Sequence, residues 1–329
     1  MPLRSGPARA RWALSLVLAL GAGSAVAAPP AEPAPKKKLP LLFARALGIV
    51  TSTVAQTEPQ PLPRPATSGF ALLPDPLVEA ELAARHAEAP SIGARVDAVT
   101  RGFVGAPYLL SALGEGEGTA PDPDPRFRLD AFDCTTLVET ALALAQTPDL
   151  EEAAALLDLV RYRGPPEFEH RRHLMTSQWI PGLVAEGWLE DITAELGGAK
   201  TRTLDLELTD ERWSKRHIAR ALVLPDDVVP KGKFPLPYLT LQDALRLERS
   251  IPQGTVLNVV RADWPASPDA VTHQGIVVLH PGDPRRFVRH ASPVSRRVID
   301  EPLAQMLERY ITRPRKWAVI GVNLLRVRE

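Results

Sequence analysis

The one cysteine of this 329-residue chain, Cys134, stands where a polar loop meets an apolar stretch with the periodicity of a helix. Asp133 precedes it and can cap that helix. A thiol in the first turn faces unpaired backbone N–H groups and the positive end of the helix dipole, which favour the nucleophilic thiolate. A buried structural cysteine is the common alternative for a lone thiol. The apolar residues at helical spacing are Leu137, Val138, Ala141, Leu142 and Ala145.

A cysteine nucleophile needs a base from another element and a polar group that orients this base. His273 begins a predicted strand, and Gly275 beside it leaves room for a close backbone. His290 ends the next predicted strand, and a turn at 281–283 could bring the two rings side by side. The sequence therefore predicts a papain-like arrangement of Cys134, His273 and His290. Either histidine alone could equally be a core residue with a satisfied hydrogen bond.

The same side chains could instead bind zinc, with His170 and His173 as further ligands. However, the sequence has no H-E-x-x-H motif, no paired cysteines and no carboxylate at a characteristic ligand spacing. It also lacks a phosphate-binding loop and a dinucleotide fingerprint. We therefore expect no metal and no cofactor.

The overall charge is balanced, with 39 basic and 39 acidic residues. Nothing in this balance favours binding to nucleic acid or to an anionic membrane surface. A single cysteine cannot form an intrachain disulfide, and an odd thiol in an exported protein is either reactive or deeply buried.

The N-terminus has the features of an export signal. Arginines precede a short apolar core at 12–20, and a small-x-small pattern follows at 25–27. The sequence thus predicts a signal peptide over residues 1–27, too short for stable membrane insertion, and export to the periplasm or out of a bacterial cell. The proline- and alanine-rich residues 28–74 are expected to form a linker. A single domain is expected over 75–329, as a monomer.

Within this domain, the pattern predicts helices first and strands afterwards, which is the order of an α+β fold. The insert from about 200 to 233 has no assigned role and could cover or shape a substrate cleft. Predicted helices cover 77–99 with a break at 89–90, Cys134 to near Pro148, 149–159, and 174–186 with a break at Ile180-Pro181-Gly182. The second half has predicted strands at 205–209, 256–261, 273–279, 286–290, 296–299 and 318–327, a short helix capped by Thr240, and a helix at 303–310.

Several short motifs together resemble one known family. Residues 132–139 read FDCTTLVE, Arg161 and Tyr162 form an R-Y pair, and Arg171 begins an R-x-H-x-x-x-x-x-W segment. A D-I-T tripeptide follows at 191–193, and H-A-S at 290–292. The set resembles the NlpC-type cell-wall cysteine peptidases, and more narrowly their branch of N-acetylmuramoyl-L-alanine amidases, over about residues 100–327. One departure is Gln178, where the resemblance would place an aspartate.

The resemblance implies a papain-like (NlpC-type) fold in which the cysteine helix packs on an antiparallel β-sheet. It implies that Cys134 attacks an amide carbonyl, that His273 takes the thiol proton and later protonates the leaving amine, and that His290 holds His273 in the correct tautomer. Tyr108 would lie close to the thiol. The expected substrate contacts are Tyr108, Asp133, Arg161, Tyr162, Arg171, His173 and Trp179. Alone, Tyr108 would more often be a packing residue, and Arg171 and His173 could form a solvated helix start.

The implied substrate is peptidoglycan or a muropeptide, cleaved without a metal at the amide between N-acetylmuramic acid and L-alanine. The same machinery could cut the stem peptide between D-glutamate and the diamino acid. A different class is a non-catalytic module that holds cell-wall peptide, and acyl transfer to another substrate is a further alternative.

Overall fold

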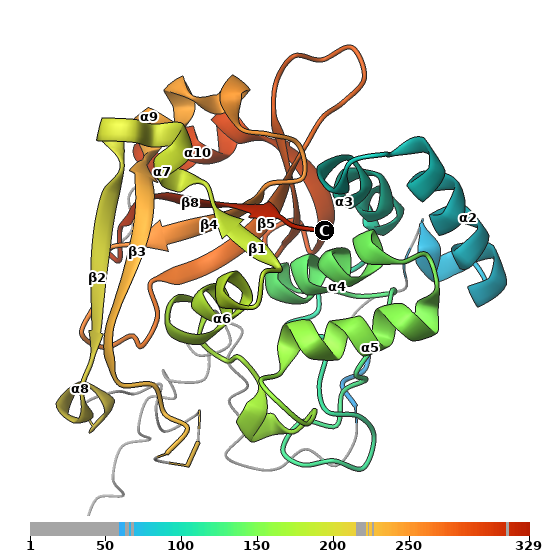
Figure 1. The fold of residues 1–329 in the computed structure, drawn as a ribbon, viewed down its shortest axis with the longest axis horizontal. Helices are drawn as coiled ribbons and strands as arrows, with labels where there is room; N and C mark the ends of the chain where they lie inside the picture. Colours follow the sequence, from blue (N-terminus) through green and yellow to red (C-terminus); the bar gives the residue numbers. More distant parts are fainter. Residues whose placement is uncertain are drawn as a thin grey trace, which may run out of the picture. The chain divides into compact units, whose positions relative to one another are not determined.

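A run of helices precedes the first strand, further helices lie between the strands, and the strands form one antiparallel sheet (Figure 1), which confirms the predicted α+β class. The computed structural model describes residues 59–62, 66, 69–214, 222, 224–225, 227–313 and 316–329. The predicted signal peptide and most of the predicted linker lie outside these residues. Among the described residues, no helix combines the length and apolar character needed to cross a membrane.

Helix α4, Cys134–Gln146, is the central helix of the first half. Asp133 caps it in a reciprocal capping box with Thr136, as the residue types at these positions favour. The apolar side chains from Leu137 to Ala145 are fully buried. They pack against α3 (Ile92–Thr100), α5 (Leu150–Arg161) and the central strand β5. The predicted helix is confirmed, and it ends two residues before Pro148.

The break predicted at Ile180-Pro181-Gly182 is wrong. A five-residue π-helical turn, Met175–Trp179, leads directly into α6, Ile180–Ala185. Pro181 lies in the first turn of α6, where a backbone N–H is not needed, so the proline starts a helix and does not interrupt one. The remaining α-helices are α2 (Asp75–Glu88), α7 (Thr193–Gly197), α8 (Asp210–Ser214), α9 (Leu241–Arg246, capped by Thr240) and α10 (Leu303–Thr312).

The sheet has the strand order β2-β3-β8-β4-β5-β6-β7, and β1 pairs with β8. The strands are β1 (Leu189–Asp191), β2 (Arg202–Leu208), β3 (Gly232–Thr240), β4 (Val256–Arg261), β5 (Val271–Val278), β6 (Phe287–Ser292), β7 (Arg297–Pro302) and β8 (Val319–Val327). Every predicted strand is found, with ends shifted by a few residues. The sequence pattern missed β1 and β3.

Strand β3 contains Pro235 and Pro237, and prolines argue against a strand that is paired on both sides. Here β3 pairs with β2 from Gly232 to Tyr238, and with β8 only at Leu239 and Thr240. The prolines therefore fall where only one neighbour is hydrogen-bonded. The described ends of the 200–233 insert thus belong to the β2–β3 ribbon at the left of Figure 1.

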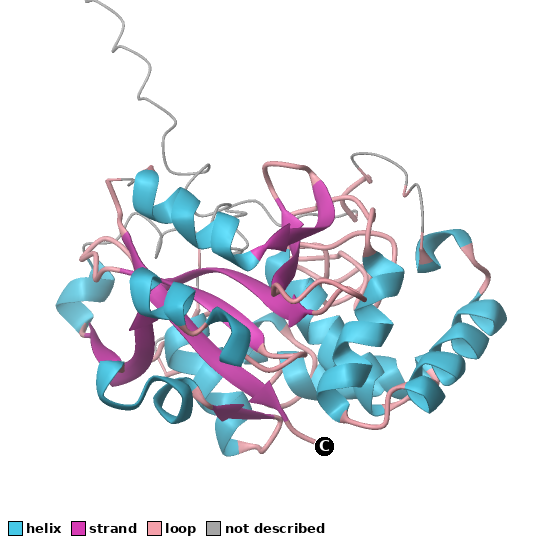
Figure 2. Cartoon of the chain, turned by 90° about the horizontal axis from the view of Figure 1, so that it is seen from above, coloured by secondary structure: helices cyan, strands magenta, loops and turns pink. Residues whose placement is uncertain are grey.

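Alternate residues of the central strands face opposite sides of the sheet and build two apolar clusters. On β5, Ile276 and Val278 join the cluster around α4, whereas Val277 joins the cluster with α9 and α10. On β6, Phe287 and Val288 divide in the same way. Figure 2 shows these helices (cyan) around the strands (magenta). The face on which a β5 or β6 side chain lies therefore decides which helices it can reach.

Packing begins before residue 75. Phe70 is buried in the α4 cluster and meets Phe103 edge to face, with ring centroids 5.6 Å apart. Gln60 donates hydrogen bonds from its backbone and side chain to Asp124. The last part of the predicted linker therefore contacts the folded domain.

We predict that Gly275→Ala lowers the free energy of unfolding by about 1–3 kcal/mol, because overpacking of a tight contact has this typical effect. A Cβ at Gly275 would lie 2.4 Å from Cγ1 of Val288 and 3.1 Å from Cβ of His290, so β5 and β6 would have to separate. Chemical denaturation measures the change. The control is Gly164→Ala, whose Cβ would make an ordinary contact of 3.9 Å. Equal stability of the two variants would contradict the predicted close approach.

Candidate active site

The thiol of Cys134 lies where the start of α4 meets strand β5. The backbone N–H of Gln274 donates a hydrogen bond to the sulfur, and the hydroxyl of Thr135 lies 4.0 Å away. Cys134 is only partly exposed. The sulfur therefore contacts the strand at the residue that directly follows His273.

The electrostatic environment favours the neutral thiol. Burial, followed by the negative charge of Asp133, raises the pKa of Cys134 to about 12, against the opposing effect of hydrogen bonds from Gln274 and Thr135. The expected thiolate at the helix start is therefore not the resting form. The proton has to be removed by a base when the sulfur reacts.

The structure brings His273 and His290 together from the neighbouring strands β5 and β6. Nε2 of His273 lies 2.7 Å from Nδ1 of His290, and the two rings are nearly perpendicular, at 86°. Burial, and then the electrostatic effects of His290 and Arg309, hold the pKa of His273 well below its usual value. His273 is thus neutral at neutral pH, and one of its ring nitrogens carries a lone pair.

Two charged residues beside this pair were not identified from the sequence. Nε2 of His290 lies 3.4 Å from Oε2 of Glu301 on β7, which is long for a hydrogen bond. Arg309 of α10 donates two hydrogen bonds to the Glu301 carboxylate. Burial alone would raise the pKa of Glu301, but His290 and Arg309 together lower it to about 2. A predicted strand followed directly by a helix was the only signal available for this contact.

Tyr108 lies close to the thiol, as the resemblance implied. Burial, and then the neighbouring Cys134 and Asp133, raise the pKa of its hydroxyl, so the phenol stays neutral. The expected substrate contact Asp133 instead binds backbone groups within the protein. Its carboxylate accepts hydrogen bonds from the backbone N–H groups of Thr135, Thr136 and Ser111.

Two expected substrate contacts, Arg161 and Trp179, are buried and bind Glu139 of α4. The Arg161 guanidinium lies 3.2 Å from one Glu139 oxygen, and the Trp179 indole N–H donates to the other at 3.0 Å. Arg161 also donates to the carbonyl of Leu113. These side chains connect α4, α5 and the π-helical turn, which is a role in holding the fold.

Arg171 and Tyr162 belong to a second buried network. Arg171 forms ion pairs with Glu115 and Asp122, and the Tyr162 hydroxyl donates to Glu115 at 3.0 Å. His173 accompanies them, with Nε2 2.6 Å from the carbonyl of Phe168. Burial, and then the charge of Arg171, lower the pKa of His173 to about 3, so its ring is neutral.

The two networks border a small cavity of about 40 Å³ next to the start of α4. The side chains of Thr135 and Thr136 form one side of it. Of the expected substrate contacts, Asp133, Arg161, Arg171 and His173 line it, whereas Tyr108, Tyr162 and Trp179 do not. The family-like motifs therefore surround the Cys134 end of α4, although most of their polar atoms are bound within the protein.

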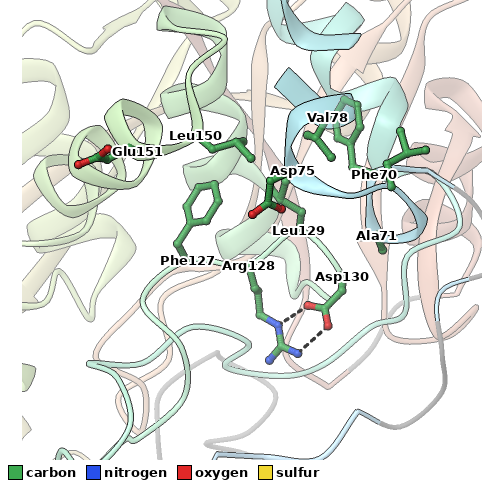
Figure 3. A pocket seen from close by; sticks show the side chains of 11 residues that line it. Phe70, Ala71, Asp75, Val78, Phe127, Arg128, Leu129, Asp130, Leu150 and Glu151 are labelled. Carbon is green, nitrogen blue, oxygen red and sulfur yellow. Dashed lines mark hydrogen bonds and ion pairs between the residues drawn. The ribbon is translucent and has the colours of Figure 1, made fainter. Parts of the chain in front are cut away.

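A larger cavity of about 440 Å³ lies between the first residues of the folded unit, the loop before Cys134 and the start of α5 (Figure 3). Phe70, Val78, Phe127 and Leu150 give it apolar walls, and Arg128 pairs with Asp130 at its edge. None of the predicted site residues lines this cavity. Among the described residues, no group of three or more His, Cys, Asp or Glu side chains is arranged to hold a metal ion.

Comparisons with known proteins place this geometry in context. A family model for N-acetylmuramoyl-L-alanine amidase-like proteins (AmiA-like) matches residues 98–312. A solved structure from Legionella pneumophila, of the DUF1460 family model, is 22% identical with a TM-score of 0.65, and the match covers 78% of this chain and 95% of that one. An N-acetylmuramoyl-L-alanine amidase from Bacteroides uniformis is 24% identical with a TM-score of 0.55, covering 72% and 99%.

A protein from Bacteroides fragilis, provisionally described as a xylanase, is 26% identical with a TM-score of 0.52, covering 69% of this chain and 99% of that one. No curated protein sequence matches the chain significantly. The solved structures show that the fold is shared along most of this chain.

We predict that alkylation of Cys134 by iodoacetamide accelerates throughout the range from pH 7 to about pH 10. The reason is that the pKa of the thiol is raised, so the thiolate fraction keeps increasing with pH. Mass spectrometry of the native protein gives the rate. A plateau already reached near pH 7 would contradict the raised pKa and would indicate a preformed thiolate.

Proposed function

Because the chain belongs to the N-acetylmuramoyl-L-alanine amidase-like family, we propose that it is a peptidoglycan hydrolase with a catalytic thiol. The proposed reaction is hydrolysis of the amide between N-acetylmuramic acid and L-alanine. The observation that supports it most directly is the pair of facing rings, His273 and His290, next to the residue, Gln274, whose backbone touches the sulfur of Cys134.

In the proposed reaction, the sulfur of Cys134 attacks the carbonyl carbon while its proton passes to the free ring nitrogen of His273. The backbone N–H of Cys134, at the helix start, is suited to donate to the developing oxyanion. The imidazolium of His273 then protonates the nitrogen of L-alanine as the C–N bond breaks, which leaves a thioester. Water, deprotonated by His273, hydrolyses the thioester and restores the thiol.

This assignment gives the buried networks around α4 a positioning role. Asp133 fixes the first turn of α4, and the ion pairs of Arg161 and Arg171 hold the neighbouring loops around the small cavity. We propose that a substrate group enters next to Thr135, where this cavity reaches the start of α4. Pocket shape then selects the bond, and an endopeptidase acting within the stem peptide would use the same catalytic residues.

The alternatives from other classes have less support. A non-catalytic module would not require two histidines in hydrogen-bond contact on the strand whose next residue touches the thiol. A glycosidase needs two carboxyl groups on either side of the scissile bond. The carboxylates next to Cys134 are already used, since Asp133 caps α4 and Glu139 binds Arg161 and Trp179.

We further propose that the protein is exported, acts as a monomer in the periplasm or outside the cell, and meets peptidoglycan or its released fragments there. The motivation is the signal-like pattern of residues 1–27. Intact mass measurement of the protein purified from a bacterial periplasm tests this. A chain that retains residues 1–27 would contradict export with cleavage.

The testing experiment for the activity is digestion of a disaccharide-tetrapeptide by the purified mature domain. We predict free disaccharide and intact peptide. We also predict a loss of about 10⁴-fold or more in kcat for Cys134→Ala, which removes the nucleophile, and for His273→Ala, which removes its base. Mass spectrometry identifies the products, and a chelator is the control.

Cleavage inside the peptide would replace the amidase by an endopeptidase with the same residues. Activity that survives Cys134→Ala but stops with the chelator would refute the thiol mechanism. Absence of turnover on every muropeptide would favour the binding module.

A further inference from the structure

A single line of contacts runs from β5 through β6 and β7 to α10. His273 lies 2.7 Å from His290, Nε2 of His290 lies 3.4 Å from Glu301, and Glu301 is held by Arg309. We infer that Glu301 is a positioning residue for the thiol hydrolase proposed above, and that it fixes the tautomers of both histidines. This inference rests on the proposed function only for its catalytic consequence.

The tautomers follow from counting donors and acceptors. An ionised carboxylate can only accept a hydrogen bond, so the nitrogen of His290 that faces Glu301 has to carry the proton. In the neutral form of His290 the other nitrogen, Nδ1, is then an acceptor, and it receives a hydrogen bond donated by Nε2 of His273. Nδ1 of neutral His273 is left with the lone pair. The base that the thiol of Cys134 needs is thereby specified at one atom.

The burial of His290 supports a proton on its Nε2. His290 is 3% exposed, and its Nε2 has no hydrogen-bond partner at ordinary distance within the described part of the chain. A buried N–H without an acceptor is unfavourable, so the carboxylate at 3.4 Å is the natural acceptor. A small approach of β7 to β6 completes the bond, and such bonds often tighten when substrate binds.

The position of Glu301 in its strand separates this role from a purely structural one. The neighbouring residue Asp300 also forms an ion pair with an arginine, Arg289. This arginine forms a second ion pair with Asp97 of α3. Asp300 therefore faces the α4 side, whereas Glu301 faces α10. Two adjacent acidic residues thus each bind an arginine. Asp300 also contacts His280, whereas Glu301 is the one that lies next to His290.

The charges around His273 come from several elements. Besides His290 on β6, they are Glu301 on β7, Arg309 on α10 and Arg261 on β4. Glu301 stabilises an imidazolium at His273, and the two arginines and His290 oppose it. Removal of the carboxylate should therefore make the imidazolium less stable, and removal of Arg309 should make it more stable.

The test compares Glu301→Gln with Asp300→Asn as the matched control. We predict that Glu301→Gln lowers kcat at least about tenfold with little change in KM, because the tautomer is no longer imposed. In the profile of kcat/KM against pH, the acid limb of Glu301→Gln should lie about one pH unit lower than that of the native protein. This is the direction expected on loss of a nearby negative charge. Asp300→Asn should lower the melting temperature but keep kcat within about twofold.

Arg309→Met is the second variant, since this partly exposed side chain can be replaced with less disturbance of the core. Its acid limb should move in the opposite direction, to higher pH. The imidazole ¹⁵N chemical shifts, assigned with His→Gln variants, report the tautomers without any need for turnover. Native His273 and His290 should both show a protonated Nε2 and a lone pair on Nδ1, and Glu301→Gln should change this pattern.

Unchanged shifts and kcat in Glu301→Gln would overturn the inference, as would an equal loss of kcat in Asp300→Asn. If the native protein shows the expected tautomers but cleaves no muropeptide, the positioning of the histidines stands and the proposed hydrolase fails. If Cys134→Ala abolishes cleavage while Glu301→Gln changes nothing, the hydrolase stands and the role of Glu301 fails.

Discussion

The carboxylate of Asp133 is the interaction on which the rest of the site depends. It satisfies two backbone N–H groups at the start of α4 and a third on the loop at Ser111, so it fixes the sulfur-bearing turn to its surroundings. Burial, and then this negative charge beside the thiol, raise the pKa of Cys134. Asp133 therefore fixes the position of Cys134 but disfavours its thiolate. A separate base has to remove the thiol proton during the proposed reaction.

The helix that carries Cys134 and the contacts of the histidine pair lie on different faces of the sheet. Helix α4 packs on one face, whereas the His290–Glu301–Arg309 contacts lie on the α10 side. Residues 273 and 274 are consecutive on β5. The His273 ring contacts His290, and the backbone N–H of Gln274 donates to the sulfur of Cys134. The small residue Gly275 makes this possible, because β6 can approach closely enough for His290 to reach His273.

The motifs that resemble the amidase family serve mainly to shape this surrounding. Arg161, Trp179 and Arg171 are buried, and each binds a carboxylate inside the protein. A buried arginine is tolerated only with such a partner, so these charges form fixed connections around α4. The shape of the cavity next to the start of α4 therefore depends on specific residue types that lie far from the sulfur.

The sequence by itself determined the helix of Cys134, because a capping aspartate and apolar residues at helical spacing are local signals. It also determined most strands and the contact between His273 and His290, since the two segments that carry them are joined by a recognisable turn. It missed β3, whose prolines are acceptable only because one side is unpaired, and it misjudged Pro181, which starts a helix. Tertiary structure alone decided the state of the thiol and the place of Glu301. Both depend on burial and on charges brought together from distant segments, and no local pattern records either.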